Sequence, residues 1–187
     1  MSAVLSLTFT PSEAAALTEL PAKRVRKEIE NHVIEAASPP RLPFGALVYF
    51  RVLQLLGIEL AVDVRARVAR RLLEAVQESL DVDAIELGQV LTLRVGAIVK
   101  SLRERTQQFE RWKERLVQSP AIMGGEPVFP NSRLSVRRVG GMLERGEEPA
   151  TIVEDYPYLT AEDVELARLF VRAYPRVGRP PTPATPH

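Results

Sequence analysis

Four cations within five residues are the strongest chemical signal in this chain. They stand just after Pro21, at the start of a predicted helix, and are Lys23, Arg24, Arg26 and Lys27. A cation at the positive end of a helix costs about 0.3–1 kcal/mol, which a bound anion would offset. The cluster therefore predicts DNA binding, mostly through phosphates. The alternative is a solvated helix face, since Glu28 and Glu30 partly neutralise the cations.

Patterns that serve enzyme chemistry are missing. The chain has two histidines and no cysteine, so disulfides and thiolate metal sites are excluded. The glycine pairs at 124–125 and 140–141 lack the strand–loop–helix spacing of a phosphate-binding loop. The acidic residues at 162–165 open a predicted helix, where they favour the helix dipole. Without a nucleophile–base pair or metal-ligand spacing, we expect no catalytic residue, no metal site and no cofactor, and the protein is predicted not to be an enzyme.

The basic cluster belongs to a pattern of two short helices. Thr10 can cap the first helix, which begins at Pro11, and Glu13 completes a capping box. After a turn of three or four residues, the second helix is predicted over residues 22–35, with His32 packed or at an interface. Small alanines and a tight turn are what a helix-turn-helix needs, because its helices lie close together. The layout is similar to the opening of MerR-like regulators.

The middle of the chain supplies a core and a long connector. Residues 44–56 are apolar nearly all round and predict a buried helix. Residues 85–93 alternate like a hairpin, which we expect to pair with a strand over residues 4–9 and form a wing. A long helix is predicted from 95 to about 117. Its heptad spacing leaves two alternatives open, a connector packed on its own domains and a dimerisation helix. A two-fold symmetric dimer would suit a DNA-binding protein, because symmetric half-sites need two recognition helices.

A further helix is predicted over residues 64–80, where apolar residues recur every four positions. The face opposite these residues is basic and carries Arg65, Arg67, Arg70 and Arg71. Such a face could flank a DNA backbone, but arginine-rich solvent faces are common. We therefore favour solvent exposure for all four arginines.

Residues 119–175 form a second punctuated unit. The pairs at 122–123 and 128–129 flank a Gly-Gly-Glu-Pro turn and predict a small hairpin. A helix that Gly146 ends and a short helix that Pro149 starts come next. Thr160 and Asp163 form a capping box that opens a third helix. The pattern predicts a trihelical, winged-helix-like module.

These residues carry a resemblance to a known family. The segments GGEPV and LERGEEPATIVEDYPYLTAEDVELA, in this order, resemble the antitoxin-like family labelled domain of unknown function four hundred and thirty-three. Residues 130–133 read PNSR where that family usually has RGTR. The resemblance covers about a third of the chain and implies a VapB-type antitoxin beside a PIN-like ribonuclease toxin. Arg176 and Arg179, in the Pro-rich tail, would be candidates to enter the carboxylate-rich site of such a toxin. A tail without a role is the alternative.

Composition fits this interpretation. The chain has 187 residues, 45% of them apolar and 26% charged, with a formal net charge of +1. A basic surface must therefore be local. No signal peptide or membrane span is expected, which favours a cytoplasmic protein. The predicted fold is mainly α with small β hairpins, and its predicted parts are a helix-turn-helix domain (1–94), a connecting or dimerisation helix (95–118), a trihelical antitoxin-type domain (119–175) and a flexible tail (176–187).

The expected function is that of a type II antitoxin. It would bind operator DNA as a homodimer, repress its own operon and neutralise a PIN-like toxin. Two alternatives stay open: a stand-alone helix-turn-helix regulator, and a protein-interaction module that does not bind DNA. The sequence does not distinguish which of the two helix-turn-helix-like modules would read DNA.

Overall fold

The computed structural model describes residues 3–89 and 91–176. It is mainly helical with two small antiparallel strand pairs, which confirms the predicted fold class. Its α-helices are α1 (Pro11–Thr18), α2 (Ala22–Glu30), α3 (Phe44–Leu56), α4 (Val62–Glu78), α5 (Gly96–Arg115), α6 (Val136–Glu144), α7 (Pro149–Asp155) and α8 (Ala161–Ala173). Its strands are β1 (Thr8–Phe9), β2 (Leu42–Pro43), β3 (Ala84–Leu87) and β4 (Leu91–Arg94), and 3₁₀ turns cover Ala3–Ser6 and Met123–Gly125. Within the described ranges, no helix is both long and apolar enough to cross a membrane.

Helices α1 and α2 lie where the sequence predicts two short helices joined by a tight turn. The capping box is present: the Glu13 amide donates to Thr10 Oγ1 at 3.2 Å, and the Thr10 amide donates to Glu13 Oε2 at 2.7 Å. Helix α2 ends at Glu30, earlier than the predicted residue 35. His32 has a φ of 55°, which stops the helix. Its side chain is exposed, so it is not packed within this chain, and an interface position stays a prediction.

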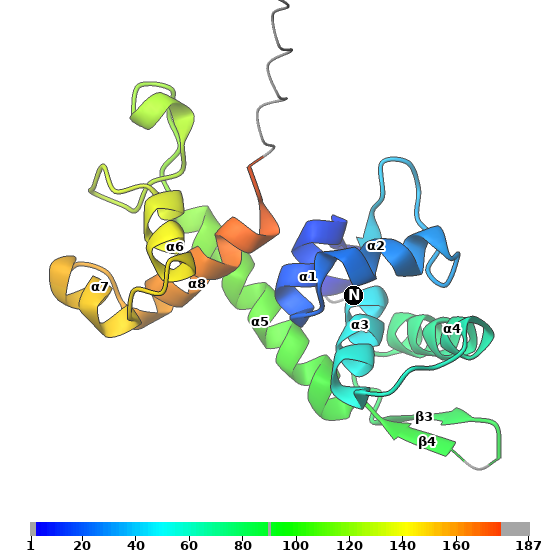
Figure 1. Cartoon of the computed structure of the whole chain (residues 1–187). Coiled ribbons are helices and arrows are strands. Elements are labelled where there is room, and N and C mark those ends of the chain that lie inside the picture. The colour runs from blue at the N-terminus through cyan, green and yellow to red at the C-terminus, as the bar shows by residue number, and fades with distance from the viewer. Residues whose placement is uncertain (1–2, 90, 177–187) are drawn as a thin grey trace, which may run out of the picture.

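The strand pairings differ from those expected. Strand β1 pairs with β2, and β3 pairs with β4 across a short turn. The predicted wing between residues 4–9 and 85–93 was therefore wrong. Phe9 and Leu42 are both buried in the N-terminal core, so the edge of β1 is taken by the strand that leads into α3. The hairpin β3–β4 instead lies beside α4 (Figure 1).

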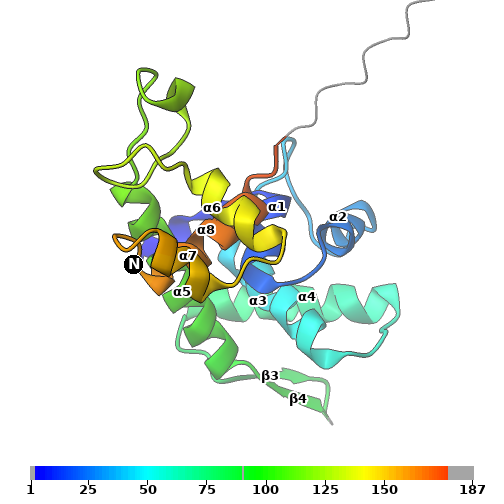
Figure 2. The ribbon, with the colours of Figure 1, turned by 60° about the vertical axis from the view of Figure 1, so that its left-hand side comes forward.

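Helix α3 is the centre of the N-terminal half, as its apolar sequence predicts. Leu47, Tyr49 and Phe50 have no exposed surface, and α3 contacts α1, α4 and α5. Helix α5 runs along the molecule from the β3–β4 hairpin to α8, as Figures 1 and 2 show. Its apolar face, which includes Val99 and Phe109, is buried against other parts of the same chain. This burial favours the connector interpretation of the helix.

The C-terminal module contains the three predicted helices α6, α7 and α8, and Thr160 and Asp163 form the predicted capping box. The hairpin predicted before them was wrong. Met123–Gly125 is a 3₁₀ turn, and Val128 instead bridges Val117 on one side and Ser135 on the other.

Candidate nucleic-acid interface

Helix α2 presents most of the predicted DNA-binding cations to solvent. Lys23, Arg26 and Lys27 are exposed, whereas Val25 on the opposite face is fully buried. The helix begins after Pro21, whose side chain cannot accept hydrogen bonds from the first-turn amides. The start of α2 therefore combines the helix dipole and uncapped amides with Lys23 and Arg26, an arrangement that attracts phosphate, whereas Lys27 lies in the last turn.

The fourth predicted cation, Arg24, belongs to a buried ionic cluster. The Glu28 cluster consists of Arg24, Glu28, Tyr49 and Arg65, and Glu28 has no exposed surface. Glu28 Oε2 accepts from the Tyr49 hydroxyl at 2.8 Å and from Arg65 Nε at 3.0 Å. Glu28 Oε1 lies 3.1 Å from Arg24 Nε, but the angles do not make a hydrogen bond, so this contact is an ion pair only.

The Glu28 cluster fixes α2 against α3 and α4, which carry Tyr49 and Arg65. Burial and the neighbouring Glu28 raise the pKa of the Tyr49 hydroxyl, so the hydroxyl stays protonated at physiological pH and donates a hydrogen bond to the carboxylate. Arg65 also donates to the Leu60 carbonyl at 2.5 Å. The expectation that Arg65 faces solvent was therefore wrong. Its position three residues before Val68 places it on the buried side of α4.

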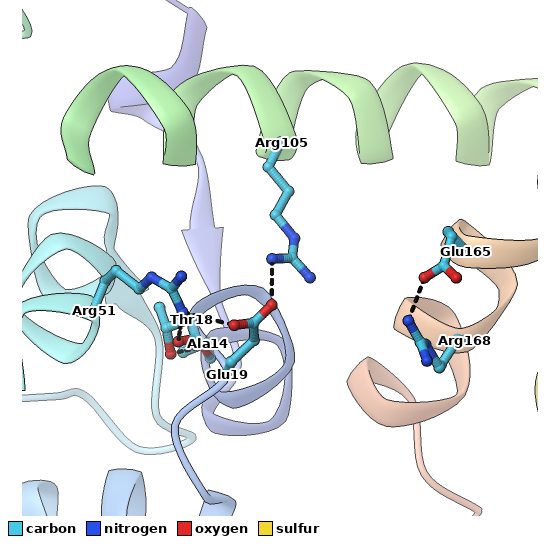
Figure 3. A network of polar contacts seen from close by, with 7 residues as sticks. All are labelled: Ala14, Thr18, Glu19, Arg51, Arg105, Glu165 and Arg168. Carbon is cyan, nitrogen blue, oxygen red and sulfur yellow. Dashed lines mark hydrogen bonds and ion pairs between the residues drawn. The ribbon is translucent and has the colours of Figure 1, made fainter. Parts of the chain in front are cut away.

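The turn between α1 and α2 is held by a second ionic group (Figure 3). Glu19 has a φ of 60° at the end of α1. Arg105 Nη1 donates to its Oε1 at 2.9 Å, and Arg51 Nη1 donates to its Oε2 at 2.7 Å. These hydrogen bonds, first that from Arg105 and then that from Arg51, lower the pKa of the Glu19 carboxyl. The turn is thereby tied to α3 and α5.

The C-terminal module presents the opposite charge at its comparable helix end. Helix α8 opens with Glu162, which is exposed, and Asp163, which is partly buried, and side chains of α5 bind both. Gln108 Nε2 donates to Glu162 at 2.8 Å, and Trp112 Nε1 donates to Asp163 Oδ1 at 2.9 Å. Burial opposes ionisation of Asp163, but hydrogen bonds from Thr160 and Trp112 together with the charge of Arg115 outweigh it and lower its pKa. An acidic helix end is unsuited to DNA phosphates, because carboxylates repel them.

The two arginines predicted to contact a toxin have different positions. Arg176 is exposed at the end of the described chain, and its Nη2 lies 2.5 Å from Glu126 Oε1. It lines a shallow groove between α6 and α8 that also includes Arg137 and Arg138. Arg179 lies outside the described residues. Among residues 3–89 and 91–176, no three histidine, aspartate or glutamate side chains gather as metal ligands.

Sequence reasoning missed the role of Glu28. A signal was present: Glu28 lies three positions after Val25 and therefore on the apolar face of α2. A carboxylate at such a position needs a buried partner, and Arg65 and Tyr49 supply it.

Part of the chain matches a family of known sequences, and the chain is similar to two further proteins. Residues 116–171 match the family described as Protein of unknown function (DUF433). The DUF433 segment begins at the end of α5 and includes α6, α7 and most of α8. A curated relative, the uncharacterized protein y4eO of Sinorhizobium fredii, is 30% identical over 91 residues, which cover 49% of this chain and 41% of that protein. The match therefore spans about two fifths of the relative's length. The crystal structure of Rv2018 from Mycobacterium tuberculosis is 16% identical, with a TM-score of 0.36 over 87% of this chain and 100% of that chain.

Proposed function

We propose that this protein is the antitoxin of a type II toxin-antitoxin module. It binds operator DNA through α2 as a cytoplasmic homodimer and neutralises a PIN-like ribonuclease toxin. The observation that carries the DNA-binding half is the exposure of Lys23, Arg26 and Lys27 on a helix that the Glu28 cluster holds in place. The toxin-binding half is supported by the DUF433 segment and its resemblance to antitoxins.

The same observations favour α2 over the C-terminal module as the DNA reader. The exposed end of α2 is basic, whereas the start of α8 is acidic and contacts α5 through Gln108 and Trp112. Phosphates are repelled by carboxylates, so α8 would bind DNA only at an electrostatic cost. Arg24 contributes indirectly in this proposal, because its ion pair with Glu28 leaves it less free to reach a phosphate.

The DNA-binding half is tested with the promoter fragment upstream of the gene. Changing Lys23, Arg26 and Lys27 together to alanine should lower the affinity and reduce the slope of log K against log salt by about 0.9 for each lost phosphate contact. The matched control changes two exposed cations of α5, Lys100 and Arg111, to alanine, and should leave the slope unaltered. An unchanged slope in the α2 variant would remove this half of the proposal.

The toxin-binding half is tested by co-expression with the neighbouring gene, followed by purification and a ribonuclease assay. Copurification with loss of nuclease activity supports an antitoxin. Neutralisation without a promoter shift would indicate an interaction module, whereas a promoter shift without toxin binding would indicate a stand-alone regulator.

A further inference from the structure

A groove between α4 and the β3–β4 hairpin forms a second surface of the N-terminal half. Its volume is about 530 Å³, and its lining is mostly aliphatic, from the end of α3, the α3–α4 loop, α4 and the hairpin. Two of the lining side chains are well exposed, Ile58 at 60% and Leu91 at 50%. Leu55, which is next to Leu56 in the sequence, and Val62, which is two positions from both Leu60 and Val64, are exposed at 56% and 47%. Exposed apolar side chains gathered around one groove are typical of an interaction site.

The rim of the α4–hairpin groove is basic. Arg67, Arg70 and Arg71 line it, and the acidic residue among its lining is Glu86. Arg67 pairs with Asp63 at 3.3 Å and Arg71 with Glu74 at 3.4 Å, both at the surface. Arg70 is exposed and forms no ion pair within the described part of the chain. The groove therefore combines an apolar floor with a rim of three arginines, of which Arg70 has no acidic partner among the described residues.

This combination selects among possible occupants. A second copy docking by two-fold symmetry would bring one arginine rim against the other, which is unfavourable. A nucleic-acid backbone would satisfy the arginines but leave the aliphatic floor without apolar contacts. An amphipathic helix that carries aliphatic residues on one face and carboxylates along its edge satisfies both features. We propose that the α4–hairpin groove docks such an acidic amphipathic segment of a partner protein.

The position of the groove leaves α2 accessible. Arg65 points to α2 through Glu28, whereas Arg67, Arg70 and Arg71 lie on the other side of α4 by helical spacing. A partner in the groove and DNA on α2 therefore occupy different faces of the N-terminal half. In the proposed function the toxin supplies the docking segment, but docking itself does not depend on DNA binding.

The test uses the full-length protein and two fluorescein-labelled probe peptides. Both form amphipathic helices with leucine on one face; one carries glutamate on the other face and its matched partner carries lysine. Fluorescence anisotropy should show the glutamate peptide binding about tenfold or more tightly than the lysine peptide. Ile58→Ser combined with Leu91→Ser should weaken it about tenfold, and Arg70→Glu should weaken it severalfold. Met123→Ser and Arg111→Glu are controls at exposed positions elsewhere, and should bind as the wild type does.

Several results would overturn the docking proposal. These are no binding of the glutamate peptide, equal binding of the two peptides, or equal binding by the groove variants when thermal melts show them folded. If the wild type sediments as a dimer, Leu91→Ser sediments as a monomer and the wild type does not bind the glutamate peptide, the groove is assigned to a second copy of the chain. If Arg70→Glu no longer binds the promoter and the wild type does not bind the glutamate peptide, the groove is assigned to DNA. Peptide binding by a protein that does not bind the toxin supports the groove and removes the proposed function.

Discussion

Glu28 shows what a single buried carboxylate does in this protein. It has no exposed surface and brings together Tyr49 of α3 and Arg65 of α4 under the proposed DNA-reading helix. Buried charges stay favourable only while every partner is in place. Removing Glu28 leaves the buried Arg65 guanidinium without a counter-ion, and its loss should therefore affect both stability and the orientation of α2.

Glu28→Ala should lower the free energy of unfolding by about 3–5 kcal/mol, because it leaves an uncompensated buried charge. Urea unfolding followed by circular dichroism measures this loss. The matched control is Glu30→Ala, an exposed carboxylate on the same helix, which should change stability by about 0.5 kcal/mol or less. Equal costs for the two variants would contradict a buried role for Glu28.

Glu19 makes the free energy of unfolding depend on pH. Hydrogen bonds from Arg105 and Arg51 lower its pKa in the folded state, so the unfolded state binds more protons. Its contribution is present above the unfolded pKa and is lost as pH falls through the lower folded pKa. Glu19→Gln should therefore cost about 0.5–1 kcal/mol at neutral pH, a magnitude suited to half-exposed pairs. The cost should shrink as pH falls below the unfolded pKa, and should vanish once pH is below the lower folded pKa, where the carboxyl group is protonated in both states.

Urea unfolding of Glu19→Gln and the wild type at neutral and acidic pH tests this sign. Glu59→Gln is the control, because Glu59 is exposed and forms no ion pair among the described residues. A difference between Glu19→Gln and the wild type that stays constant with pH would show that Glu19 acts through its shape alone.

At the scale of elements, the crossing of α6 and α8 depends on one glycine of a pair. A Cβ on Gly140 would lie 2.5 Å from Val171 Cγ1 and 2.6 Å from the Ala167 carbonyl oxygen, whereas a Cβ on Gly141 would come no nearer than 3.6 Å to a side-chain atom of Arg145. Gly140→Ala should destabilise by about 1–3 kcal/mol through overpacking. Gly141→Ala should stabilise by about 0.5–1 kcal/mol, since alanine favours helix. Thermal unfolding of the two variants checks the opposite signs; a shared sign would contradict the close contact.

Elements defined by local chemistry could be predicted from the sequence. Both capping boxes, at Thr10 and Thr160, form as expected, because each needs only residues three positions apart. Strand partners depend on distant segments, so the pairing of β1 with β2 and the two bridges of Val128 could not be read from periodicity. The end of α2 was missed because His32 adopts a left-handed conformation that no local signal indicated.

The candidate interface was predictable to a similar degree. The position of the basic residues on a helix follows from spacing, and three of the four are exposed. The buried ion pair between Arg24 and Glu28 could not be predicted from spacing. In an isolated helix this pair would lie at the surface, and it becomes buried only when α3 and α4 pack on α2. The same tertiary packing moved Arg65 from the expected solvent face into the core.

For the whole molecule, α5 is the element that joins the two halves. Near the N-terminal half its Arg105 binds Glu19, and near the C-terminal half its Phe109 and Trp112 are buried. A cluster between α1, α5 and α8 adds to this connection: the Tyr174 hydroxyl donates to Glu13 at 2.6 Å and accepts from Lys113 at 2.9 Å. Burial, and then the hydrogen bond to Glu13, raise the pKa of Tyr174 to about 12. The two halves are thus expected to unfold together.

This dependence gives a test on the DUF433 segment itself, which begins at residue 116 and excludes the whole of α5. Trp112 contacts Phe129 and Phe170 with ring centroids 6.2 Å apart, and its indole binds Asp163 in the capping box of α8. A fragment of residues 116–176 therefore lacks a large part of its own core and should give the poorly dispersed amide spectrum of an unfolded chain. A fragment of residues 95–176 restores α5 and should recover dispersion, and Trp112→Ala in that fragment should remove it again. Well-dispersed amides in the shorter fragment would show that the segment folds without the connector, and the two halves would then be separable units joined only at their surfaces.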